Sequence, residues 1–304
     1  MNRALVVGIS GFVGSHLARY LVDNGWSVLG FDQQPLTGFD VQTGDLLDRT
    51  IVEQVILEAR PEFIFLLAGV LKADYPGQFY TAHVLGTVTL LDAVLKSDLR
   101  PTVIVASSSA VYGAGLGKKA ITENFRPRPV THYAVSKLAQ EMVALRYWTA
   151  FRLPVIRVRT FNLLGPGLSP VMACSDFARQ IAQAEKQGRA STISTGDLSA
   201  RRDFVDVRDA ARAYALLAEK GRAGQVYNVA SGRPVVIRGC LDFLREQARV
   251  PVEVVMDPAR VQKNDVPIQI GSAKQLYDVT GWEIKISVEQ SLLDMLEDWR
   301  RKVV

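Results

Sequence analysis

The feature that most constrains this chain is a run of three evenly spaced glycines directly after a short apolar segment. The run Gly8-Ile9-Ser10-Gly11-Phe12-Val13-Gly14 separates the apolar segment Ala4–Val7 from a stretch with helical periodicity. Glycines let a backbone turn tightly and approach a pyrophosphate, whose charge is stabilised by the N-terminus of the following helix. Glycines also occur in ordinary turns, but the strand-turn-helix order favours a dinucleotide site. The expected contacts are Gly8, Ser10, Gly11, Phe12, Val13 and Gly14.

Short β-branched segments alternate with helical periods through the first half of the chain. The expected strands are Ala4–Val7, Ser27–Phe31, Phe63–Leu67, Thr102–Ser107 and Pro154–Arg159. The expected helices are Gly14–Asn24, Ile51–Ala59, Phe79–Lys96 and His132–Ala150. This alternation is typical of βαβ units, and it predicts an α/β fold with a doubly wound parallel sheet of the Rossmann type.

The pattern becomes less regular after Phe161, where Gly165-Pro166-Gly167 and the Pro251–Pro267 stretch punctuate shorter elements. A helix at Asp206–Lys220 and a strand at Gln225–Val229 are expected to return to the main sheet. We therefore predict a Rossmann domain over 1–160 and a smaller substrate-binding lobe over 161–304, from which about 204–230 rejoin the sheet.

Composition excludes several other classes of protein. With 304 residues, 48% of them apolar, the chain can bury a sizeable core. The net charge of +5 favours an anionic small molecule, but the basic residues are scattered and predict no nucleic-acid partner. Two cysteines suit a reducing compartment, and no apolar run is long enough for a membrane span or a signal peptide. We expect a cytoplasmic protein, without a metal site because its three histidines are scattered.

Asp32 ends the second expected strand, where a carboxylate can accept hydrogen bonds from the adenosine ribose hydroxyls. It would repel a 2′-phosphate, so NAD is favoured, although NADP stays open and Asp32 could be a simple turn residue. Asp45 and Leu46 fall where they could reach the adenine. Further cofactor contacts are expected from Leu67, Ala68, Gly69, Ser107, Tyr133 and Lys137.

A serine-rich strand end and a Tyr-x-x-x-Lys pair supply candidate catalytic groups. Ser107-Ser108-Ser109 closes the fourth expected strand, and Tyr133 and Lys137 lie one turn apart on a helix. A nearby ammonium stabilises the phenolate and brings a tyrosine toward its operating pH. Such a pair is common by chance, but its position after a glycine-rich turn and a serine-rich strand end favours catalysis. Ser108 would bind the same substrate oxygen as Tyr133.

These motifs resemble the extended short-chain dehydrogenase/reductase family of nucleotide-sugar enzymes, also known as the NAD-dependent epimerase/dehydratase family. The resemblance covers nearly the whole chain. Besides the glycine turn and the Ser-Tyr-Lys set, it rests on Arg159-Thr160-Phe161-Asn162, Arg202-Asp203-Phe204-Val205-Asp206-Val207 and Val226-Tyr227-Asn228-Val229. Within the family, the segments 175–181, 264–267 and 280–282 look most like GDP-4-keto-6-deoxymannose reductases of deoxysugar biosynthesis.

The resemblance implies an oxidoreductase that reduces a 4-keto-6-deoxy sugar nucleotide. Ala110 stands where the family's 4,6-dehydratases carry a glutamate base, and alanine cannot take a proton. Two alternatives stay open. One is a nucleotide-sugar 4-epimerase that holds NAD tightly, and the other is a non-catalytic NAD(H)-sensing protein. In relatives, helices matching Phe79–Lys96 and His132–Ala150 pair across a dimer interface, so a homodimer is expected.

The resemblance also implies substrate contacts, namely Ser108, Ser109, Asn162, Arg179, Arg202 and Asp265. Arginine suits a nucleotide because its planar fork binds phosphate oxygens in pairs. Alternatively, Asn162 could cap a turn and Arg202 could pair with Asp203 or Asp206.

Several positions depart from the family pattern. Gln262 and Lys263 stand where the family usually has an arginine, and Leu163 and Leu164 stand where its reductases tend to have a polar residue. Leu66 replaces a frequent histidine, and His83 replaces the usual asparagine. The cofactor frame is intact while the substrate pocket differs, so a different nucleotide sugar is a further possibility.

Overall fold

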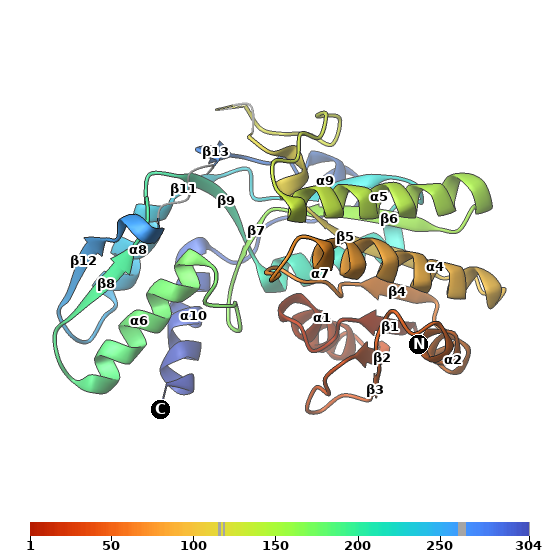
Figure 1. The fold of residues 1–304 in the computed structure, drawn as a ribbon, viewed down its shortest axis with the longest axis horizontal. Coiled ribbons are helices and arrows are strands. Elements are labelled where there is room, and N and C mark those ends of the chain that lie inside the picture. Colours follow the sequence, from red (N-terminus) through yellow and green to blue (C-terminus); the bar gives the residue numbers. More distant parts are fainter. Residues whose placement is uncertain (115–116, 118, 261–265, 304) are drawn as a thin grey trace.

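The computed structural model describes residues 1–114, 117, 119–260 and 266–303. Within this part of the chain a parallel sheet of seven strands forms the larger half of the molecule, in the order β10-β6-β5-β4-β1-β2-β3 (Figure 1). The strands are β1 (Arg3–Val7), β2 (Ser27–Asp32), β3 (Val41–Thr43), β4 (Phe63–Leu66), β5 (Thr102–Ser108), β6 (Val155–Thr160) and β10 (Val226–Val229). Both faces of the central strands are buried, which explains their nearly continuous apolar sequences.

Helices cover both faces of this sheet, as the predicted doubly wound fold requires. Helices α1 (Phe12–Asp23) and α7 (Val207–Lys220) pack together on one face, around Leu17 and Tyr214. The other face carries α2 (Arg49–Ala59), α4 (Gly86–Lys96) and α5 (His132–Phe151), packed around Leu90 and Ala144. Helix α9 (Lys274–Thr280) contacts α7 and β10.

The single helix predicted over Phe79–Lys96 is wrong in one respect. The segment is divided into α3 (Gly77–Tyr80), a π-helical turn η1 (Thr81–Leu85) and α4. A π turn inserts one residue into the helical repeat and so changes which side chains face inward. The apolar pattern continues through the turn, so periodicity alone gave no sign of it. The edge strand β3 was also absent from the prediction, since three half-exposed residues leave little pattern.

The smaller half, on the left of Figure 1, has its own core of three helices. They are α6 (Ala173–Gln187), α8 (Ile237–Glu246) and α10 (Val288–Lys302). Its strands are β7 (Asn162–Leu164), β8 (Ser191–Thr195), β9 (Arg201–Asp206), β11 (Pro234–Val236), β12 (Val252–Met256) and β13 (Ile268–Gln269). Strand β9 pairs with β7, β11 and β13, and β8 pairs with β12. Short 3-10 turns cover Ser109–Tyr112 (η2) and Pro258–Arg260 (η3).

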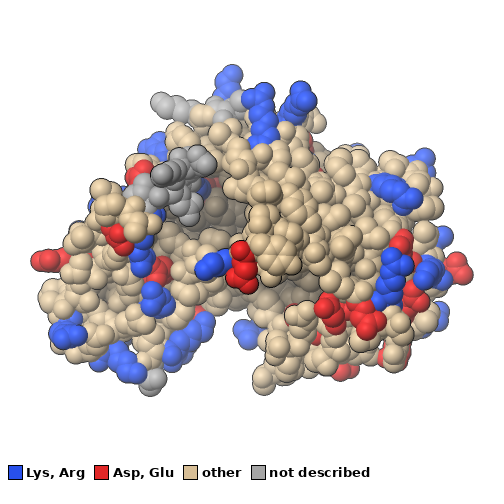
Figure 2. Space-filling view, in the orientation of Figure 1, with Lys and Arg blue, Asp and Glu red and all other residues tan. Residues whose placement is uncertain are grey.

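The chain crosses between the two halves more than once. It leaves the large sheet after β6, and β7 already pairs with β9 of the smaller half. It then returns through α7, and β10 adds to the sheet in parallel with β6. The domain division at residue 160 stays a prediction. Figure 2 shows that the surface is hollowed between the two halves.

Candidate active site

The glycine turn after β1 is shaped by close backbone contacts. Gly8 has a φ of +90°, and its amide donates to Phe31 O at 2.8 Å. A Cβ on Gly8 would lie 2.5 Å from the Ala68 amide nitrogen, and one on Gly14 would lie 2.1 Å from Gly8 O. Both distances are too short for any side chain, so these two positions require glycine.

Helix α1 begins without a side chain that could accept hydrogen bonds from its first amides. Asp48 caps α2 and Thr131 caps α5 in that way, whereas the residue before α1 is Gly11, which has no side chain. The uncapped amides and the helix dipole suit a phosphate group. The turn therefore fits the pyrophosphate of a dinucleotide, which Ser10, Gly11, Phe12 and Val13 would hold.

Asp32 lies at the end of β2, beside this turn. Its carboxylate accepts hydrogen bonds from the Ser10 amide at 3.0 Å and the Gln33 amide at 2.7 Å. The carboxylate thus helps to fix the turn, and its contact with a ribose stays a prediction. Asp45 is exposed and accepts from the Leu47 amide at 2.9 Å.

The remaining expected cofactor residues line the other side of the turn. The amides of Leu67 and Ala68 both donate to Val7 O at 2.9 Å, so this chain segment follows the end of β1. A Cβ on Gly69 would lie 3.7 Å from Lys137 Nζ, which places Gly69 next to the candidate catalytic lysine. The Leu46 side chain packs on Gly86 at the start of α4.

The structure brings together Ser108, Tyr133 and Lys137. Ser108 ends β5, and its hydroxyl accepts from the Ala110 amide at 3.1 Å. Tyr133 lies in the first turn of α5, and its side chain interacts with that of Ser108. Burial raises the pKa of Tyr133, and the interaction with Ser108 opposes that rise. The phenol therefore carries its proton at neutral pH.

Lys137 lies one turn further along α5 and is buried. Its ammonium donates to Ala106 O at 2.9 Å and to Gln140 Oε1 at 3.1 Å. Burial lowers the pKa of Lys137 to about 8, against the opposing effect of the nearby Glu141 carboxylate. The lysine is thus a fixed positive charge near neutral pH, one helical turn from Tyr133.

The two neighbours of Ser108 have their hydroxyls bound within the protein. Ser107 Oγ donates to Glu141 Oε1 at 2.5 Å, and Glu141 forms a buried ion pair with Arg159 at 2.7 Å. Ser109 Oγ donates to Gln269 Oε1 at 3.0 Å, and Gln269 Nε2 donates back to Ser109 O. Ser109 was expected to bind substrate, but its buried hydroxyl is directed to Gln269 instead.

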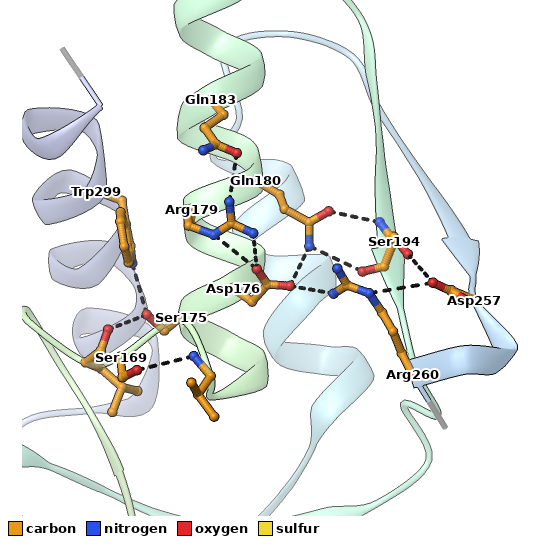
Figure 3. Close-up of polar contacts among 12 residues, drawn as sticks. Ser169, Ser175, Asp176, Arg179, Gln180, Gln183, Ser194, Asp257, Arg260 and Trp299 are labelled. Carbon is orange, nitrogen blue, oxygen red and sulfur yellow. Dashed lines mark hydrogen bonds and ion pairs between the residues drawn. The ribbon is translucent and has the colours of Figure 1, made fainter. Parts of the chain in front are cut away.

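In the smaller half, Arg179 belongs to a group of charges around one carboxylate (Figure 3). Arg179 Nη2 lies 2.5 Å from Asp176 Oδ1, and Arg260 Nη1 lies 2.7 Å from Asp176 Oδ2. Gln180 also donates to Asp176 Oδ2, at 2.8 Å. Arg260 was not among the expected residues. Its only sequence signal is that it precedes the positions where the family pattern places an arginine.

Two other expected substrate residues, Asn162 and Arg202, lie on β7 and β9. Asn162 Nδ2 donates to Asp203 O at 3.2 Å, and Arg202 Nη1 donates to the carbonyls of Arg201 and Val266. Asp203 is fully buried and accepts from backbone amides, while Asp206 caps α7. Asp265, Gln262 and Lys263 lie outside the described residues.

His83 was noted in the sequence only as a departure from the family pattern. The structure buries it completely, with its ring centre 5.6 Å from that of Tyr133. Across the described residues, no group of three or more His, Cys, Asp or Glu side chains could hold a metal ion. Nor does the described part of the chain contain a helix long and apolar enough to cross a membrane.

The chain is similar to known proteins over nearly its whole length. The model of the NAD dependent epimerase/dehydratase family matches residues 4–230. GDP-6-deoxy-D-mannose reductase of Pseudomonas aeruginosa is 35% identical over 99% of this chain and 98% of its own length.

Two solved structures are similar over the whole fold. RMD from Pseudomonas aeruginosa complexed with NADPH has a TM-score of 0.89 and 33% identity, covering 99% of this chain and 100% of that chain. UDP-glucose 4-epimerase from Thermotoga maritima with UDP-glucose has a TM-score of 0.90 and 26% identity, covering 100% of both chains.

Proposed function

This chain belongs to the NAD dependent epimerase/dehydratase family, and on that premise we propose that it reduces the 4-keto group of a 6-deoxy sugar nucleotide. It is an NAD(P)-dependent enzyme that acts on a nucleotide sugar. The observation that carries the proposed reaction is the grouping of Ser108, Tyr133 and Lys137 at the end of β5, beside a turn that fits a pyrophosphate.

The chain's own residues would bind and protonate the ketone oxygen. When bound, the reduced nicotinamide supplies the hydride that reaches the carbonyl carbon. Ser108 would hold the carbonyl oxygen by a hydrogen bond, and Tyr133 would transfer its phenolic proton to that oxygen as the C–O double bond becomes single. The product is a secondary alcohol. The charge of Lys137 would stabilise the phenolate form of Tyr133 that remains after the proton transfer.

Ala110 argues against a dehydratase. It follows Ser109 directly in the η2 turn, at the position where the family's 4,6-dehydratases carry a glutamate. A methyl group cannot remove the proton from the sugar C5, so the Ser-Tyr-Lys set would act on the ketone alone.

The nucleotide half of the substrate would lie against the smaller half of the protein. Arg179 and Arg260 meet on Asp176, and each retains donors that suit a diphosphate. Similarity to GDP-6-deoxy-D-mannose reductase supports guanosine as the base. NADPH in the similar RMD structure supports NADP as well as NAD, despite Asp32.

A nucleotide-sugar 4-epimerase is the second candidate. It is favoured by the similarity to UDP-glucose 4-epimerase over the full chain. An epimerase uses the same tyrosine and lysine but returns the hydride to the sugar, so it shows no net redox change.

The first experiment is a thermal-shift screen with GDP, UDP, dTDP and CDP in the presence of NADH or NADPH. A shift with GDP alone, followed by cofactor oxidation with GDP-4-keto-6-deoxymannose, would support the proposed reductase. Copurified NAD and interconversion of UDP-sugars without cofactor turnover would instead establish the epimerase.

A further inference from the structure

The π-helical turn η1 carries a buried histidine into the candidate active site. His83 is the central residue of Thr81–Leu85 and is 0% exposed. A π turn interrupts the regular helical hydrogen bonding, and such turns are frequently found at functional sites. Buried polar side chains also need hydrogen-bond partners, so the partners of His83 indicate what its side chain does.

The two ring nitrogens have distinct partners. The Val70 amide donates to His83 Nε2 at 3.2 Å, so this nitrogen must be the acceptor. Nδ1 therefore carries the proton and donates to Ser136 Oγ at 2.8 Å. The Ser136 hydroxyl in turn donates to the Tyr133 carbonyl at 2.8 Å. This chain of bonds connects the 69–76 loop to the backbone of the catalytic tyrosine.

The histidine ring also contacts the tyrosine ring. The ring centres of His83 and Tyr133 lie 5.6 Å apart with an interplanar angle of 80°. Phe79 completes the group, with an edge contact to Tyr133 and a stacked contact to His83. Edge-to-face contacts of this kind are attractive and directional, so they restrict the orientation of the Tyr133 ring.

A second chain of bonds leads from the same residue to the lysine. The His83 carbonyl accepts from Thr87 Oγ1 at 2.6 Å, and Thr87 Oγ1 accepts from Gln140 Nε2 at 2.9 Å. Gln140 Oε1 then accepts from the Lys137 ammonium at 3.1 Å. His83 is thus linked through its side chain to Tyr133 and through its backbone to Lys137.

From this geometry we propose that His83, neutral and protonated on Nδ1, is a positioning residue that fixes Tyr133 and Lys137 for the ketone reduction. The inference rests on the proposed function. Burial, followed by the charge of Lys137, lowers the pKa of His83 to about 3. The ring therefore acts as a fixed hydrogen-bonding group, and proton transfer stays with Tyr133.

The arrangement itself can be tested on the holoenzyme without substrate. Nitrogen-15 NMR of histidine-labelled protein, with His83→Gln used to assign the signal, should show the Nδ1-protonated neutral ring from pH 8 to pH 5. A ring protonated on Nε2, or charged at pH 6, would overturn the inference.

The contribution to catalysis is tested with two substitutions. His83→Phe keeps a planar ring but removes both nitrogens, and it should lower kcat about 10- to 100-fold, as expected for a small misplacement of catalytic groups. KM for the sugar nucleotide and the cofactor Kd should stay within about threefold, because neither ligand loses a contact. His83→Asn returns a donor near the place of Nδ1 and should recover most of kcat.

The matched control is Tyr80→Phe, which removes a hydrogen bond to the exposed His132 from the adjoining helix α3 without touching His83. Its kcat should equal that of the wild type. Equal kcat in His83→Phe and wild type would overturn the positioning role. If the wild type reduced no 4-keto sugar nucleotide, the proposed function would fail, and the NMR result would still decide the arrangement of His83.

Discussion

At the scale of single residues, the proposed mechanism assigns proton donation to Tyr133 and the positive charge to Lys137. Burial raises the pKa of Tyr133, which keeps its proton available, while Lys137 bears a charge that its hydrogen bonds hold in place. In that mechanism the phenol of Tyr133 needs the charge of Lys137, because burial alone raises the pKa of the tyrosine. Their separation by one helical turn allows the ammonium to act on the phenolate.

Tyr133→Phe should therefore lower kcat for ketone reduction about 10²- to 10⁴-fold, the usual contribution of a general acid. Binding of NADH or NADPH should be little changed, because the aromatic ring stays. Turnover is measured by the loss of nicotinamide absorbance and binding by its fluorescence. The control Tyr277→Phe, on the exposed face of α9, should behave as wild type. Near-normal turnover in Tyr133→Phe would exclude the mechanism.

Arg179→Ala should weaken binding of the nucleotide sugar while leaving catalysis at the bound ketone intact. We expect KM to rise about 10-fold or more, as for the loss of one charge-assisted hydrogen bond, with kcat within about threefold. Arg189→Ala removes the same charge from the exposed segment after α6 and is the control. If both variants show the same KM, Arg179 has no part in substrate binding.

At the scale of elements, the turn before α1 combines close backbone packing with uncapped helix amides in one short segment. Its glycines allow the backbone to pass Ala68 and Gly8 O at distances that exclude a Cβ. The absence of a side chain at Gly11 leaves the first amides of the helix for an anion. Helices α2, α5 and α7 use an Asp or Thr cap instead, so the start of α1 is the better candidate for holding a phosphate.

Gly14→Ala tests that reasoning. The added methyl group would meet Gly8 O and displace the turn, so affinity for NADH should fall at least about tenfold, the effect of losing one good hydrogen bond to phosphate. Fluorescence titration measures the change. Gly239→Ala in α8 is the matched control, since no atom lies within 4 Å of the added methyl group. Unchanged affinity in Gly14→Ala would refute the role of the turn.

At the scale of the whole molecule, the buried His83 makes the free energy of unfolding depend on pH. Its pKa is about 3 in the folded protein and near 6.5 when unfolded. Because the folded pKa is the lower one, the stabilisation is complete above pH 6.5 and is lost as pH falls toward 3. The nearby ionisable side chains are Lys137, which stays charged in that range, and Tyr133, which stays neutral.

Wild-type protein should therefore lose about 1.4 kcal/mol per pH unit more than His83→Asn between pH 6 and pH 5, the value for one proton. Urea unfolding at each pH gives the free energy of unfolding for both proteins. Parallel curves would mean that His83 titrates normally.

The predicted homodimer can be tested by a substitution on the exposed face of α5. Val135 and Met142 lie two turns apart on α5 and are 37% and 47% exposed, which leaves an apolar stripe on that helix. We predict that this stripe pairs with a second copy, and that Met142→Lys gives a monomer in sedimentation velocity where the wild type is a dimer. Lys substitution of Tyr277, on the far helix α9, should leave the mass unchanged.

The sequence by itself determined the sheet, the glycine turn after β1 and the spacing of Tyr133 and Lys137 on one helix, because each depends on local order. Alternating apolar strands, glycines at fixed spacing and a Tyr-x-x-x-Lys helix are visible without knowing what packs against them. The tertiary structure decided the π turn at His83, the meeting of Arg179 with Arg260 on Asp176, and the use of the Ser109 hydroxyl by Gln269. The contacts of His83 with Ser136, Asp176 with Arg260 and Ser109 with Gln269 join residues far apart in the chain, so no local sequence pattern identifies these partners.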